Sequence, residues 1–132
     1  MQVTTAPAQN KPSVTILAIQ GEINAQTSDQ FETAARQAIE SGARNLLLDL
    51  TQVPYVSTVG LRAIQAIFNL LHTPDTEAEH EVMRKGLRDG SFKSPHLKLL
   101  NPSPEVAKVL KITGFDMFIE SYRDLRAALA AF

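Results

Sequence analysis

Apolar runs of two different periodicities constrain the fold of this chain most. Short, β-branched or leucine-rich runs at 14–19, 46–50 and 97–100 are typical of buried strands, and a shorter one is expected at 117–119. Between such runs apolar residues recur at helical spacing, as along 31–39. Strands that alternate with amphipathic helices predict a mostly parallel sheet with helices packed on it. We therefore expect an α/β fold with a mixed, mostly parallel, four- to five-stranded sheet and about four helices.

The distribution of prolines and charges suggests the domain organisation. A chain of 132 residues predicts one domain. Residues 1–13 carry two prolines among small and polar residues, so we expect a flexible N-terminal tail before a domain at 14–132. Within 72–95 the apolar pattern gives way to charged residues between turn signals at 73–75 and 89–91. Because connections of this length are uncommon inside a domain, we interpret this segment as an insertion.

Composition argues against several classes of function. Thirteen Lys and Arg face fourteen Asp and Glu, so there is no basic excess to neutralise a nucleic-acid backbone. The chain has no cysteine, which excludes disulfides and thiolate metal sites. No apolar run approaches the roughly 18–20 residues of a membrane span, and the first residues do not resemble a signal peptide. We expect a cytoplasmic protein with no nucleic-acid partner and no direct membrane insertion.

The residues needed for catalysis do not occur in recognisable patterns. The three histidines, His72, His80 and His96, are not spaced as metal ligands or as members of a catalytic triad. Residues 56–60 do not form the nucleophile elbow of hydrolases, and no phosphate-binding glycine loop is present. We therefore expect no enzyme activity, no metal and no cofactor.

One arrangement does suggest a site. Asp49 ends the predicted central strand, a loop follows, and Ser57 and Thr58 open an amphipathic helix with Gly60 in its first turn. Hydroxyl residues are common helix caps that stabilise by typically ~1 kcal/mol, and this is the structural interpretation. The functional interpretation is a phosphoacceptor, because a phosphate there would meet free backbone amides and the positive end of the helix dipole. A glycine in the first turn would also let a partner approach the backbone closely.

Four segments occur in the order of a known family. Residues 21–24 read GEIN, 46–51 read LLLDLT, 55–61 read YVSTVGL, and 103–106 with 112–115 read SPEV and ITGF. They resemble the motifs G-E-[IL]-D, apolar-D-L-[ST], [FY]-[MIV]-D-S-[ST]-G-[LI] and S-P-x-V…[ST]-G-[LF] of the STAS domain, which occurs in bacterial anti-sigma-factor antagonists and in sulfate transporters. The resemblance implies a single STAS-like domain and a non-catalytic regulatory binding module.

The resemblance also implies a partner and a switch. In the antagonists of this family, the serine after the motif aspartate is phosphorylated by a Ser/Thr kinase that is also the anti-sigma factor, and phosphate blocks the complex. Here Thr58 occupies the acceptor position, while Ser57 replaces the aspartate and is a second acceptor candidate. Asp49 is given a supporting role. The expected partner-binding patch contains Asn24, Thr27, Tyr55, Ser57, Thr58, Gly60 and Leu61, the last equally well explained as a core residue.

The sequence is compatible with two other functions. The missing motif aspartate motivates a STAS scaffold or transporter-accessory subunit that acts by protein–protein assembly, including homo-oligomers, without phosphorylation. A nucleotide-binding protein or enzyme that uses Asp49 and the hydroxyls of Ser57 and Thr58 is weaker, because no base, metal set or phosphate loop accompanies them.

Overall fold

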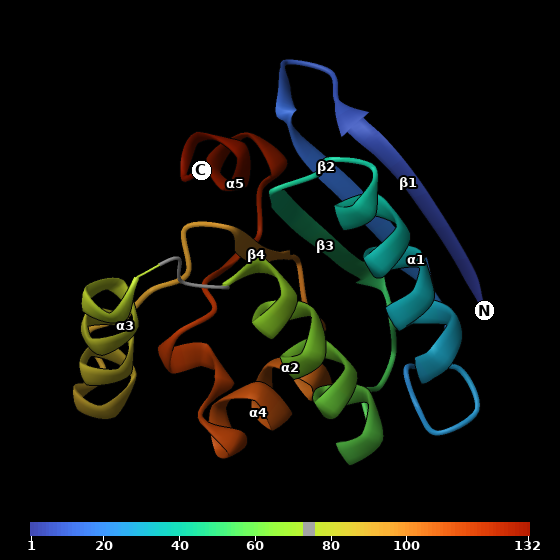
Figure 1. The fold of residues 1–132 in the computed structure, drawn as a ribbon. Coiled ribbons are helices and arrows are strands. Elements are labelled where there is room, and N and C mark those ends of the chain that lie inside the picture. The colour runs from blue at the N-terminus through green and yellow to red at the C-terminus, as the bar shows by residue number, and fades with distance from the viewer. Residues whose placement is uncertain (73–75) are drawn as a thin grey trace.

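The computed structural model describes residues 1–72 and 76–132, so the turn expected at 73–75 lies outside the described residues. The central sheet has five strands in the order β1-β2-β3-β4-β5, with β1 antiparallel to β2 and the other pairs parallel (Figure 1). This confirms the expected single α/β domain with a mixed, mostly parallel sheet. The elements along the chain are β1 (Gln2–Ala8), β2 (Lys11–Gln20), α1 (Ser28–Glu40), β3 (Asn45–Gln52), α2 (Thr58–Leu71), α3 (Glu77–Asp89), β4 (Leu97–Leu100), α4 (Pro104–Thr113), the 3-10 turn η1 (Phe115–Met117), β5 (Ser121–Tyr122) and α5 (Leu125–Ala130).

The N-terminal segment is a strand, which corrects the expectation of a flexible tail at 1–13. β1 pairs with β2 from Gln2 opposite Gln20 to Pro7 opposite Thr15, and the register shifts after Pro7. The run of threonine and valine before Pro7 favours extended backbone. A proline is tolerated here because β1 is an edge strand whose outer side needs no hydrogen-bond donor. The prolines therefore mark an edge of the sheet and not a tail.

Apolar side chains cover both faces of the sheet. On one face, Leu48 and Leu99 belong to the large core, which also contains residues of α1, α2 and α4. Successive residues of a strand point to opposite faces, so Leu47 and Leu100 lie on the other face, where Ala128 of α5 packs against them. This two-sided burial explains why the central strands read as nearly continuous apolar runs.

The described part of the segment between α2 and β4, residue 72 and residues 76–96, contains one helix. α3 is capped by Thr76, whose side chain accepts a hydrogen bond from the Glu79 amide, and it ends at Gly90 in the left-handed conformation. Figure 1 shows it at the outer side of the molecule, beyond α2 and α4. The prediction of a strand at 117–119 is wrong, because Met117 ends the 3-10 turn and the last strand lies at Ser121–Tyr122. No helix within 1–72 or 76–132 combines the length and apolar character needed to cross a membrane.

Candidate functional site

The loops before α1 and α2 lie side by side at one edge of the sheet. Both helices follow parallel strands, so their N-terminal ends point to the carboxyl edge, where sites of open α/β sheets gather. An isolated parallel bridge joins Ile23 to Val56. The Ile23 amide donates to the Tyr55 carbonyl at 3.0 Å, and the Ser57 amide donates to the Ile23 carbonyl at 2.9 Å. These bonds place five of the expected residues together in what we call the α2-start surface: Asn24, Thr27, Tyr55, Ser57 and Thr58.

The two hydroxyl residues at the start of α2 have different environments. Ser57 is the N-cap, and its half-buried side chain accepts a hydrogen bond from the Gly60 amide at 3.2 Å. Thr58 is the first helical residue and is exposed, and its hydroxyl makes no hydrogen bond within 1–72 or 76–132. The amides of Thr58 and Val59 belong to the first turn, where helical backbone donors have no intrahelical acceptor. Thr58 thus presents a free hydroxyl beside two backbone donors.

Asn24 and Thr27 lock the neighbouring loop. The Asn24 Oδ1 accepts from the amides of Gln26 at 2.9 Å and Thr27 at 3.2 Å. The Thr27 Oγ1 accepts from the Asn24 amide at 2.9 Å and donates to the Glu22 carbonyl at 2.6 Å. Both side chains are therefore engaged within their own loop. They fix the shape of the surface beside Tyr55, which is 46% exposed.

Gly60 and Leu61 lie beneath this surface. Leu61 is 7% exposed and belongs to the large core. A Cβ atom at Gly60 would lie 2.4 Å from the Ile23 carbonyl oxygen and 2.9 Å from the Val56 Cγ1. The glycine is required for close packing of α2 on the preceding loop, so its close approach is to the chain itself. The expectation that it opens the backbone to a partner is corrected accordingly.

Asp49 is not brought to the hydroxyl pair. It alternates with Leu48 and Leu50 along β3 and so faces the side of the sheet where α5 packs. Its Oδ1 accepts from the amide of Thr51 at 3.1 Å and from the hydroxyl of Thr51 at 2.6 Å. Its support is local, because it stabilises the end of β3.

Sequence reasoning missed the residue that holds the surface together, Ile23. It contributes both backbone groups of the bridge, and its side chain is fully buried. The signal available was the motif at 21–24, whose third residue is Ile23.

The first turn of α2 has no acidic residue, and Arg62, one turn further on, is exposed. Within the described chain, no group of three or more His, Asp or Glu side chains is placed to hold a metal.

The fold of this chain matches those of solved structures. The structure of an anti-sigma factor antagonist from Mycobacterium paratuberculosis superimposes with a TM-score of 0.74, over 98% of this chain and 92% of that chain, at 20% identity. The phosphorylated form of the Bacillus cell fate determinant SpoIIAA gives a TM-score of 0.62, over 99% and 100% of the two chains, at 14% identity. This chain therefore has a SpoIIAA-like fold.

Sequence comparison identifies the family. The STAS domain profile matches residues 5–77, which is more than half of the chain. The chain therefore belongs to the STAS domain family. A relative in Bordetella bronchiseptica, BtrV, whose name describes a candidate anti-sigma factor antagonist, is 26% identical over 117 residues, which cover 89% of this chain and 84% of BtrV.

Proposed function

We propose that this protein is a non-catalytic anti-sigma factor antagonist of the cytoplasm, switched by phosphorylation of Thr58. Its partner is an anti-sigma factor that is also a Ser/Thr kinase, and the α2-start surface is the docking face. The observation that carries the proposal is the exposed hydroxyl of Thr58 at the first residue of α2 in a STAS domain.

The surroundings of the two hydroxyls favour Thr58 over Ser57 as the acceptor. The Ser57 oxygen caps the helix through the Gly60 amide, and esterification there would disturb a bond worth typically ~1 kcal/mol. Phosphorylation of Thr58 leaves that cap intact. It adds about −1.5 to −2 charges beside the first-turn amides, where the helix dipole favours an anion. The phosphate would therefore alter the charge of the docking face without unfolding the domain.

Phosphate mapping tests the acceptor assignment. The protein is incubated with ATP and the kinase encoded beside its gene, and mass spectrometry locates the phosphate. We expect label on wild type and on Ser57→Ala, and none on Thr58→Ala. Ser103→Ala is the matched control for Ser57→Ala, because Ser103 caps α4 through the Val106 amide in the same way. Label that survives in Thr58→Ala would overturn the assignment to Thr58.

Binding to the unphosphorylated domain tests the docking face. Thr58→Glu places a negative charge at the acceptor position and is expected to weaken the kinase complex at least about tenfold, which corresponds to about 1.4 kcal/mol. Val59→Ala changes an exposed neighbour without changing charge and is expected to bind as wild type does. Equal affinity of Thr58→Glu and wild type would remove the α2-start surface from the interface.

Assembly without phosphorylation is the second candidate function. It is favoured by Ser57, whose side chain caps the helix at the position where the family motif has an aspartate. A scaffold or transporter-accessory subunit would form a stable complex with itself or another subunit irrespective of ATP. Light scattering after size-exclusion chromatography tests the homo-oligomer, and a monomer at high concentration together with labelled Thr58 excludes it in favour of the switch.

A further inference from the structure

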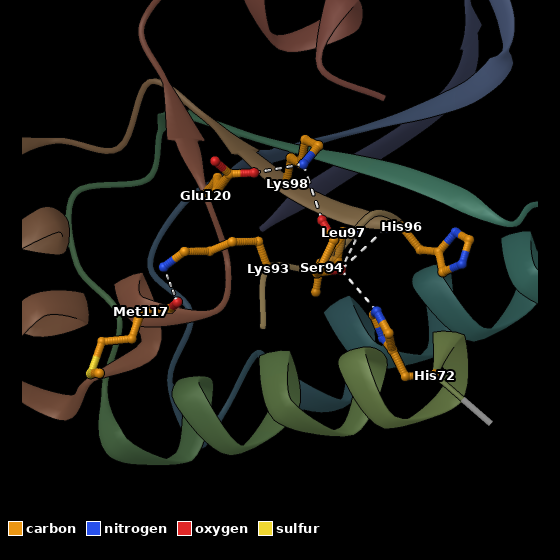
Figure 2. Close-up of polar contacts among 8 residues, drawn as sticks. All are labelled: His72, Lys93, Ser94, His96, Leu97, Lys98, Met117 and Glu120. Carbon is orange, nitrogen blue, oxygen red and sulfur yellow. Dashed lines mark hydrogen bonds and ion pairs between the residues drawn. The ribbon is translucent and has the colours of Figure 1, made fainter. Parts of the chain in front are cut away.

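Three segments far apart in the sequence meet at a buried serine on the side of the molecule away from the α2-start surface. Ser94 lies before β4 and is completely buried. Figure 2 shows it between His72, the residue that caps the C-terminal end of α2, and the backbone that leads into β4. The Ser94 amide also donates to the Phe118 carbonyl at 2.8 Å. The hydrogen bonds of Ser94 therefore connect the C-terminal end of α2 to the sheet.

The hydrogen-bonding capacity of this cluster is fully used. The Ser94 Oγ accepts from the amides of His96 at 3.2 Å and Leu97 at 2.9 Å. Its hydroxyl hydrogen is left to donate to the His72 Nε2, which lies 2.9 Å away. The His72 Nδ1 lies 2.8 Å from the Phe68 carbonyl and must carry a hydrogen to donate to it. These partners assign His72 as a neutral ring with its hydrogen on Nδ1.

The ionisable neighbours of His72 come from two packed elements. The His96 ring, from the start of β4, lies with its centroid 5.4 Å away, and its Nδ1 is 2.9 Å from the Asn45 Oδ1. Glu79 of α3 lines the same cavity of about 240 Å³ as both histidines. Burial lowers the pKa of His72, the Phe68 carbonyl opposes this, and His96 lowers the pKa further. Burial also lowers the pKa of His96.

Two lysines near Ser94 bind groups other than its hydroxyl. The Lys93 Nζ donates to the Met117 carbonyl. The Lys98 Nζ donates to the Ser94 carbonyl at 3.0 Å and pairs with the Glu120 Oε1 at 3.0 Å (Figure 2). The His72 ring is therefore the group whose charge decides the state of the Ser94 hydroxyl.

His72 also forms part of the seat of α3. Phe92 follows α3, and its ring meets the rings of His72 and Phe68 edge-on, at centroid distances of 5.6 and 6.1 Å. The Phe92 amide donates to the Gly86 carbonyl of α3 at 3.0 Å. A Cβ at Gly86 would lie 2.9 Å from the Phe92 Cβ, so the helix rests directly on this residue. The edge-on contact between Phe92 and His72 thus connects α3 to the C-terminal end of α2.

We propose that the hydrogen bond between His72 and Ser94 holds the segment 76–95 against the domain, and that protonation of His72 breaks this bond and releases the segment. A proton added to the His72 Nε2 would point at the Ser94 hydroxyl hydrogen. The Ser94 oxygen cannot accept it, because two backbone amides already occupy its lone pairs. The bond is then lost, and the charged ring leaves its place beneath Phe92.

The direction of the pH dependence follows from the lowered pKa of His72. At pH values above 6.5, the usual pKa of histidine, the His72 ring is neutral and the hydrogen bond to Ser94 is formed. As the pH falls through the lowered pKa of His72, the fraction of molecules with the His72–Ser94 hydrogen bond declines. Below that pKa it falls by about tenfold for each pH unit. We therefore expect release at a pH below 6.5 while the sheet remains folded.

Hydrogen exchange measured at about pH 7.5 and about pH 5, corrected for intrinsic rates, tests the proposal. We expect the amides of 77–92 to lose protection at the lower pH in wild type. In His72→Gln the glutamine can accept a hydrogen bond from Ser94 but does not titrate, so the protection of 77–92 in this variant should not change with pH. His80→Gln removes an exposed histidine of α3 and should behave as wild type does. His96→Gln should retain the pH response.

Histidine titration by NMR supplies an independent readout on the unaltered protein. We expect His72 to carry its hydrogen on Nδ1 at neutral pH and to titrate with a pKa below the usual value of 6.5. A His72 midpoint at or above 6.5, or unchanged protection of 77–92 in wild type, would overturn the proposal. So would a pH response that persists in His72→Gln or disappears in His96→Gln.

Discussion

Replacement of Gly60 by alanine tests the packing on which the α2-start surface depends. The added Cβ would lie 2.4 Å from the Ile23 carbonyl oxygen, where carbon–oxygen contacts are ordinarily at least about 3.3 Å. It would also lie 2.9 Å from the Val56 Cγ1. The opposing atoms are backbone and a buried side chain, so neither can turn away into solvent.

The expected loss of stability is a balance of three contributions. Overpacking of a dense site costs about 1–3 kcal/mol. Displacement of the Ile23 carbonyl weakens its hydrogen bond from the Ser57 amide, a net contribution of about 1 kcal/mol. Alanine has a helix propensity about 1 kcal/mol better than glycine, which acts in the opposite direction. We therefore expect Gly60→Ala to lower the free energy of unfolding by about 1–3 kcal/mol.

Urea unfolding followed by circular dichroism measures this difference. With a denaturant dependence of about 1–3 kcal/mol/M, the midpoint should fall by roughly 1 M. Val59→Ala is the matched control, because Val59 is the adjacent residue of the same turn and is 38% exposed. Its effect should stay within about 0.5 kcal/mol. If Gly60→Ala were as stable as wild type, helix propensity would outweigh the clash and the argument for close packing on Ile23 would be refuted.

Three further perturbations probe the core, the buried ion pair and the pH response. Phe31→Ala removes a fully buried ring and should cost about 3–5 kcal/mol in urea unfolding. Glu120→Gln leaves the buried Lys98 ammonium without its carboxylate and should cost about 1.5–3 kcal/mol. Lys98→Met removes the charge as well and should cost less in the same assay, about 1 kcal/mol, because the hydrogen bond to the Ser94 carbonyl is lost. The pKa of His96 is lowered by burial, so its neutral form stabilises the fold above about pH 6.5, and that contribution is lost as pH falls through the folded pKa. His96→Gln should therefore reduce the loss of unfolding free energy between about pH 7 and pH 5.

The central strands could be predicted because their sequence reports burial on both faces. Leu46 to Leu50 has a single polar member, and the observed β3 is covered by helices on both sides. β1 could not be predicted in the same way, since an edge strand can contain prolines and polar residues that are equally typical of a tail. The apolar residues at 117–119 were assigned to a strand although Gly114, in the left-handed conformation, starts a 3-10 turn there. Composition alone does not distinguish these two structures over so few residues.

Only the local part of the candidate site could be predicted. The cap at Ser57 and the exposure of Thr58 depend on neighbours within one turn of helix, which a sequence pattern reports. The role of Gly60 depends on Ile23, which is distant in the sequence. The face of the sheet on which Asp49 lies depends on strand register, because a shift of one residue reverses it. These long-range relations appear only when the loops before α1 and α2 are paired.

That pairing also limits what a switch at Thr58 can do. The Ile23 carbonyl accepts the Ser57 amide and lies directly against Gly60, so the first turn of α2 cannot move relative to the loop before α1 without breaking both contacts. The Asn24 and Thr27 side chains hold that loop independently. The α2-start surface therefore keeps one shape. Under the proposed function, a phosphate on Thr58 would act on a partner through its charge and volume, and the domain around it would have the same backbone in both states.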